Sequence, residues 1–143
     1  MIALGIFSVF AVLACHWLGI YLIRLSFQGT LERLGPRGRW GGEVAFALAI
    51  FGLVVLNFAD VLICAALVRA QDGSLGYGDA FQFAIANFTT VGLDKPVDAS
   101  IPALAGPLIA MCGIVSFGWS TSFLVACSHA ARLHQGGRAL PPG

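Results

Sequence analysis

Three long apolar stretches constrain the fold of this chain more than any other feature. They run from Ile2 to Ile23, from about Val44 to Val68 and from about Ile101 to Ala131. Each reaches the roughly 20 residues that a helix needs to cross the hydrocarbon layer of a membrane. The 143 residues are 58% hydrophobic and only 10% charged, outside the usual range for soluble domains. We therefore predict an all-α membrane protein of one domain with three transmembrane helices.

The first stretch is expected to stay in the mature protein. It has no basic start and is longer than the apolar region of a signal peptide. It is predicted to form an N-terminal transmembrane helix over residues 1–27.

A fourth apolar segment lies between the second and third long stretches. Ala80 to Phe88 is too short to cross a membrane and too apolar for an ordinary loop, which is typical of a re-entrant segment. Asp79 precedes it and is expected to cap a short helix over 79–88. Residues 76–78 are expected to form a turn before that helix.

The charges of the two connections differ and predict the orientation. Residues 28–42 and their flank are rich in arginine, with Arg24, Arg33, Arg37 and Arg39. The second connection is mainly acidic, with Asp72, Asp79, Asp94 and Asp98 against Arg69 and Lys95. An excess of Lys and Arg favours the cytoplasmic side. We expect a cytoplasmic linker over 28–42, a short cytoplasmic tail over 134–143, and the N-terminus outside.

Several classes of function lack the residues they require. The net charge of +1 and the absence of a basic, aromatic cluster argue against a nucleic-acid partner. The three histidines are scattered, so no enzymatic site, cofactor or small-molecule substrate is expected. The four cysteines lie singly in apolar runs and are predicted to be small buried hydrophobic residues, namely Cys15, Cys64, Cys112 and Cys127.

The segment that follows the short helix, Thr89-Thr90-Val91-Gly92, resembles the pore loop of potassium channels. Two further segments agree with that resemblance. Residues 113–118, Gly-Ile-Val-Ser-Phe-Gly, are similar to the inner helix of bacterial potassium channels, and residues 57–61 and 119–124 look like a subgroup of small bacterial potassium channel proteins. The resemblance covers about residues 45–131.

This resemblance implies a pore domain over residues 43–133, within the inner (plasma) membrane and surrounded by lipid. Its parts would be an outer helix over 44–68, a pore helix over 79–88, a filter over 90–94 and an inner helix over 101–131. Four copies would form a homotetramer that conducts K⁺, with Na⁺ as a further permeant ion. The ion-coordinating carbonyls would come from Thr90, Val91, Gly92, Leu93 and Asp94. 

Gly113 matches the glycine proposed as a gating hinge, and close packing of small residues is the alternative interpretation.

The outer half of the predicted filter departs from the family pattern. Leu93-Asp94 stand where the family has Tyr-Gly, and Ala86 replaces the pore-helix glutamate. The outer mouth would carry Asp94, Lys95 and Asp98. A shortened filter leaves two alternatives open, a weakly selective or nonselective cation channel and a non-conducting pore-like membrane subunit.

Asp60, with Asn57 one turn earlier, is the only carboxylate deep in a predicted membrane helix. Such a charge is costly in a membrane and implies a partner or access to water. Bracing of the pore helix and an ion relay are the two roles considered for Asp60. His16 is a possible partner, although a packing role for this histidine is favoured.

Overall fold

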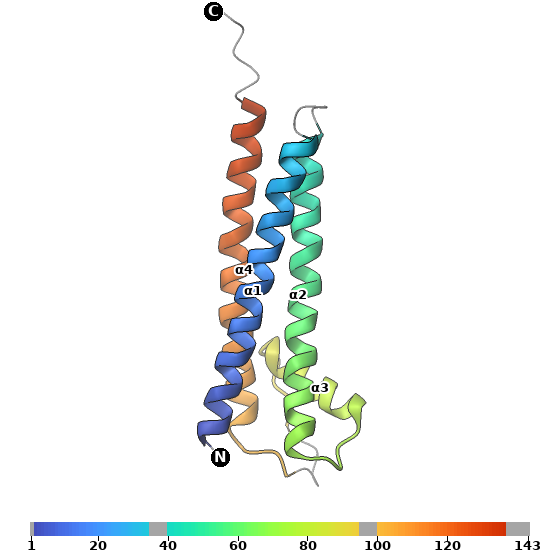
Figure 1. The fold of residues 1–143 in the computed structure, drawn as a ribbon. Helices are drawn as coiled ribbons and strands as arrows, with labels where there is room; N and C mark the ends of the chain where they lie inside the picture. Colours follow the sequence, from blue (N-terminus) through green and yellow to red (C-terminus); the bar gives the residue numbers. More distant parts are fainter. Residues whose placement is uncertain (1, 35–39, 95–99, 137–143) are drawn as a thin grey trace, which may run out of the picture. The chain divides into compact units, whose positions relative to one another are not determined.

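A computed structural model describes residues 2–34, 40–94 and 100–136, and these residues form four helices without a strand (Figure 1). The helices are α1 (Ile2–Leu34), α2 (Gly41–Gln71), α3 (Tyr77–Phe88) and α4 (Ala105–Gly136). Segments of α1, α2 and α4 are long and apolar enough to cross a membrane, over Ile6–Leu34, Gly41–Gln71 and Ala105–Arg132. The all-α class and the three candidate membrane spans are confirmed.

The helices extend beyond the predicted bounds, most clearly at the first connection. Gly29 was expected to belong to a linker over 28–42, but α1 continues through it to Leu34. The hydroxyl of Ser26 donates to the Leu22 carbonyl at 3.1 Å and that of Thr30 to the Ser26 carbonyl at 2.8 Å. These polar side chains are therefore satisfied inside the helix, and a single glycine costs only about 1 kcal/mol there.

The described residues divide into two compact units, and the long helices contribute to both. Unit 1 contains residues 2–17, 57–94 and 100–118, while unit 2 contains residues 18–34, 40–56 and 119–136. The first half of α1 belongs to the unit that contains α3.

The core of unit 1 is built around α3, which lies beside α2 (Figure 1). Phe83, Ala84 and Phe88 of α3 are buried together with Val12 of α1. The rest of this buried cluster comes mainly from α2 and α4 and includes Val61, Cys64, Ala65, Val68, Ala105, Ile109 and Cys112. A short helix in contact with three long ones has its orientation set by packing.

The core of unit 2 is smaller and depends on small residues. It contains Phe27, Ala45, Ala49, Cys127 and Ala131. Gly52 packs closely on α1, because a Cβ added there would lie 3.1 Å from Cγ1 of Ile23. Small side chains at helix contacts are the usual means of close approach between membrane helices.

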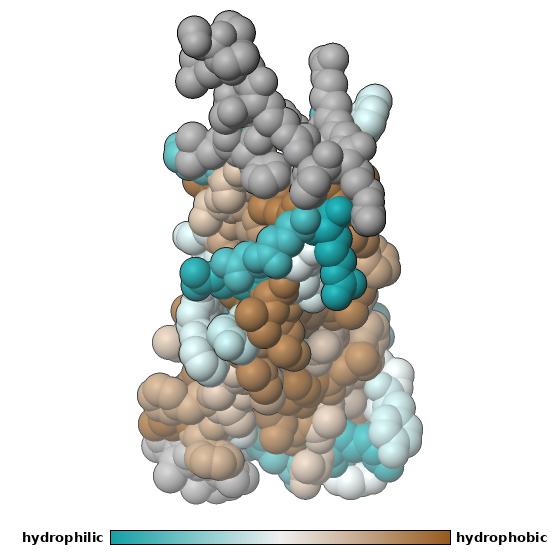
Figure 2. All heavy atoms as spheres, turned by 45° about the horizontal axis from the view of Figure 1, so that its top comes forward, coloured by the Kyte–Doolittle hydropathy of each residue, from teal (hydrophilic) through white to brown (hydrophobic). Residues whose placement is uncertain are grey.

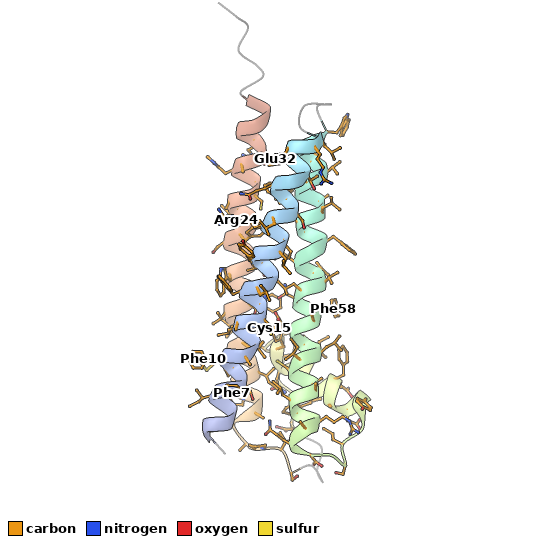
Figure 3. All side chains as sticks on the ribbon, viewed as in Figure 1. Phe7, Phe10, Cys15, Arg24, Glu32 and Phe58 are labelled. Carbon is orange, nitrogen blue, oxygen red and sulfur yellow. The ribbon has the colours of Figure 1, made fainter. Side chains whose placement is uncertain are left out.

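Large apolar side chains also cover the outside of the helices. Figure 2 shows mostly apolar residues over the described part of one face. Phe7 and Phe10 of α1 and Phe58 of α2 point outward in Figure 3 and are more than half exposed. Cys15 is also exposed, so its predicted burial is wrong, whereas Cys64, Cys112 and Cys127 are buried as predicted. Exposed apolar surface of this kind suits contact with lipid.

Candidate functional site

The candidate site is the end of α3 and the segment 89–94 that follows it. The buried residues of α3 are Ala80, Phe83, Ala84, Asn87 and Phe88. They recur at the three- and four-residue spacing of one helix face. This face anchors α3 in the core of unit 1, and residues 89–94 after it are all exposed.

The start of α3 differs from the prediction. Gly76, with φ −62° and ψ 149°, is the N-cap, and no side chain caps the helix. Tyr77 and Gly78 are already helical, and Asp79 lies in the first turn instead of at the cap. A carboxylate in the first turn still favours the helix through the positive end of its dipole.

Arg69, near the end of α2, holds the connection into α3. Its guanidinium donates to the carbonyls of Leu75 at 2.6 Å and Gly73 at 3.2 Å. The same guanidinium lies over the ring of Tyr77, 4.1 Å from the ring centre. By hydrogen bonding to the phenol and by its charge, Arg69 lowers the pKa of Tyr77 below its usual value. The first residue of α3 is thereby tied to the end of α2.

Asp72 joins the connections that precede and follow the site. One carboxylate oxygen accepts from the amide of Ser74 at 3.1 Å and from its hydroxyl at 2.5 Å. The other accepts from the amide of Ser100 at 2.8 Å. The hydrogen bond from the Ser74 side chain, followed by those from the Ser100 and Ser74 amides, lowers the pKa of Asp72. Its carboxylate therefore fixes the end of α2 to the chain that leads into α4.

The backbone after α3 has left-handed residues at alternating positions. Thr90 has φ 62° and Gly92 has φ 77°, whereas φ of Val91 between them is not positive. A β-branched residue at positive φ is an outlier that costs about 1–2 kcal/mol. Strained residues of this kind are concentrated at functional sites.

Two amide hydrogen bonds hold this conformation. The amide of Thr90 donates to the Asn87 carbonyl at 2.9 Å, and that of Gly92 donates to the Ala86 carbonyl at 3.0 Å. The pattern is similar to a Schellman end with one additional residue before the last donor. No hydrogen bond from the described part of the chain reaches the carbonyls of Thr90, Val91 or Gly92.

The side chain of Asn87, which the sequence did not point to, binds the main chain of Leu93. Its side-chain amide donates to the Phe83 carbonyl at 2.9 Å and to the Leu93 carbonyl at 3.2 Å. The Leu93 carbonyl, predicted to coordinate an ion, is thus engaged by Asn87. A polar residue on the buried face of α3 was the available signal, because a buried amide requires partners.

Gly113 of α4 contacts the C-terminal end of α3. A Cβ added at Gly113 would lie 2.8 Å from the carbonyl carbon of Phe88 and even closer to its carbonyl oxygen. The Phe88 ring packs edge-on against Phe117, with 5.5 Å between ring centres. The contact supports the packing interpretation of Gly113, and its role as a hinge stays a prediction.

Asp60 pairs with His16, although a packing role was favoured for this histidine. Its Oδ2 lies 2.6 Å from Nδ1 of His16, and both side chains are fully buried in unit 1. Asn57 lies one turn earlier on α2 and is half-buried. His16 therefore pairs with a carboxylate, and the prediction of a simple packing role was wrong.

Two groups of predicted site residues remain apart from this geometry. Asp94 is exposed at the end of the described segment, while Lys95 and Asp98 of the predicted outer mouth lie outside the described residues. Within the described residues, no group of three His, Cys, Asp or Glu side chains could hold a metal ion.

The fold and site define an α-helical protein suited to a membrane, with three long apolar helices and one short buried helix. Comparison with models of protein families found no match, and comparisons with curated proteins and with solved structures found none either.

Proposed function

We propose that the chain is one subunit of a potassium channel-like pore that conducts monovalent cations passively. The observation that carries this proposal is the backbone of residues 90–92. Thr90 and Gly92 are left-handed, and the carbonyls of Thr90, Val91 and Gly92 accept no hydrogen bond from a described residue. These three carbonyls can replace the water that a cation sheds when it enters a filter.

The position of α3 supports the same proposal. Its 12 residues extend about 18 Å, less than the roughly 30 Å of the hydrocarbon layer. We infer that α3 is re-entrant and that its C-terminal carbonyls, negative by the helix dipole, favour a cation near residues 90–92.

An assembly is required, because one exposed loop cannot enclose a path for ions. Val91 is 80% exposed although it is apolar, and neighbouring copies around the pore would cover it. Closed symmetry is the general solution for such contacts. The resemblance to potassium channels implies four copies. The excess of Lys and Arg around the first connection favours an orientation in which residues 89–94 face the outside.

One observation favours a weakly selective channel as the second candidate. Asn87 donates to the Leu93 carbonyl at 3.2 Å and so competes with a cation for one of the expected rings of main-chain carbonyls. Selectivity depends on the number of coordinating groups and on their field strength. Fewer ordered sites would reduce the preference for K⁺ over Na⁺.

The test is ion flux into liposomes that contain the purified full-length protein, with K⁺, Na⁺ or Li⁺ gradients, after its oligomeric mass has been measured. We expect a tetramer that passes K⁺, and equal passage of Na⁺ would select the second candidate. A tetramer that passes no ion would exclude both and leave a non-conducting subunit. A monomer or dimer would contradict the assembly.

A pair of glycine variants shows whether flux depends on residues 90–92. Gly92→Ala places a side chain at φ 77° and is expected to abolish or strongly reduce flux. Gly78→Ala is the matched control. Position 78 is helical, within α3, and the added Cβ would meet no atom within 4 Å. Equal flux in both variants would contradict the proposed filter.

A further inference from the structure

A buried pair of ionisable side chains joins α1 to α2 in unit 1. His16 and Asp60 are both 0% exposed, and their Nδ1 and Oδ2 atoms are 2.6 Å apart. The two residues lie within the candidate spans of α1 and α2. An ionisable residue inside a membrane is costly and indicates a functional site with a specific partner.

The charges of this pair depend on how many protons it holds. With one proton the pair is neutral overall, as an ion pair or as two uncharged groups. With none it carries a buried negative charge, and with two a buried positive charge. Burial of an uncompensated charge is strongly unfavourable. The state with one proton is therefore favoured over the states with no proton and with two protons.

Among the described residues, Asp72 is the other buried charged side chain, and it lies 12 residues beyond Asp60 in the chain. The titratable groups near it are the thiols of Cys64 on α2 and Cys112 on α4, each within electrostatic range of Asp60. The buried face of α3 has only apolar residues and one amide, and Asp79 of that helix is exposed. The charge state of the pair is thus governed by its own protons.

Two buried oxygen atoms of unit 1 have unused hydrogen-bonding capacity. The second carboxylate oxygen of Asp60, Oδ1, and the hydroxyl of Ser116 have no hydrogen-bond partner within the described residues. Ser116 is fully buried and lies one helical turn beyond Cys112, on the same face of α4. A hydroxyl can donate to a carboxylate or accept from a carboxylic acid, so Ser116 suits either form of Asp60.

We propose that His16 and Asp60 form an intramembrane proton-binding site that holds one shared proton, with Ser116 as a third polar group. The base comes from α1 and the acid from α2, so the site exists only when the two helices are docked. This assigns a role to the first helix, which supplies the group that neutralises Asp60. The inference does not depend on whether the protein conducts ions.

The direct test is nuclear magnetic resonance of the full-length protein in lipid bilayers, with ¹⁵N-labelled histidine. The background carries His129→Gln and His134→Gln, so that the protein signals come from His16, and free ¹⁵N-labelled histidine in the same buffer is the reference. Between about pH 5 and pH 8, the span in which histidine commonly changes charge, we expect the His16 ring signals to stay constant. His16 ring signals that change with pH as those of free histidine do would overturn the proposal.

Variants then identify the groups that share the proton. Asp60→Asn keeps the shape but removes the acid, and it is expected to shift the His16 ring signals; unchanged signals would contradict the pair. Ser116→Ala should shift the ¹³C carboxyl signal of Asp60, and Ser128→Ala, a half-buried serine of the same helix, should not. The measurement on a protein with His16 and Asp60 both unchanged tests the proposal even if a variant fails to fold.

Discussion

Replacement of Gly113 by alanine tests the most constrained contact around α3. The added Cβ would lie 2.8 Å from the carbonyl carbon of Phe88. Contacts of a Cβ atom shorter than 3.0 Å essentially never occur in proteins. The obstacle is main chain, so no rotamer change can remove it. Either α4 or the end of α3 must move.

The expected cost follows from two opposing effects. Overpacking of a core costs about 1–3 kcal/mol, and a clash with backbone belongs at the upper end, about 3 kcal/mol. Alanine is a better helix former than glycine by about 1 kcal/mol. The net loss is about 2 kcal/mol, which lowers the folding equilibrium constant roughly 30-fold.

The measurement is reversible unfolding of the full-length protein in mixed micelles, followed by circular dichroism. Gly118→Ala is the control on the same helix, because its Cβ would meet no atom within 4 Å. We expect this control to be neutral or up to about 1 kcal/mol more stable. Phe88→Leu should not rescue Gly113→Ala, because the carbonyl that clashes is retained.

The hinge interpretation of Gly113 predicts no loss of stability on replacement by alanine. If this glycine only provides flexibility, alanine should leave stability unchanged or raise it while altering ion flux. A Gly113→Ala protein as stable as the unsubstituted one would refute the packing argument.

Three further predictions concern the two ends of α3. Asp72→Asn should remove an acid-sensitive part of stability: the pKa of Asp72 is lowered by folding, so its contribution is present above the ordinary value of 3.8 and lost as pH falls below it. Thermal unfolding at several pH values should therefore show a steeper acid loss for the original protein than for the variant. Arg69→Met should raise the pKa of Tyr77, measured by phenolate absorbance in a protein whose other tyrosine is phenylalanine; an unchanged titration would contradict the contact. Thr90→Gly should stabilise the fold by about 0.5–1 kcal/mol, because glycine adopts φ 62° without strain, and a loss in chemical unfolding would contradict the argument.

The helices were largely predictable, and their ends were not. Run length and hydrophobicity indicated three spans, and the short apolar segment from Ala80 to Phe88 indicated a short helix between the second and third. The prediction of a linker beginning at residue 28 failed because a single glycine, Gly29, does not end α1, which continues to Leu34. The cap assigned to Asp79 failed because Gly76 adopts the extended N-cap conformation instead.

The candidate site was predictable as a segment but not as a set of contacts. The sequence drew attention to residues 89–94 and to Asp60. It did not reveal that Asn87 engages Leu93, or that Asp72 links Ser74 to Ser100. Such bonds depend on the path of loops, which no periodicity records.

The sequence by itself determined the solvent for which the chain is suited and the number of long helices, because transfer into a membrane depends on the length and hydrophobicity of each segment alone. Tertiary structure decided which residues meet. The pairing of His16 with Asp60 and the contact of Gly113 with Phe88 join positions far apart in the chain. Their register depends on how three helices pack around α3, since a shift of one residue would turn each side chain to another face.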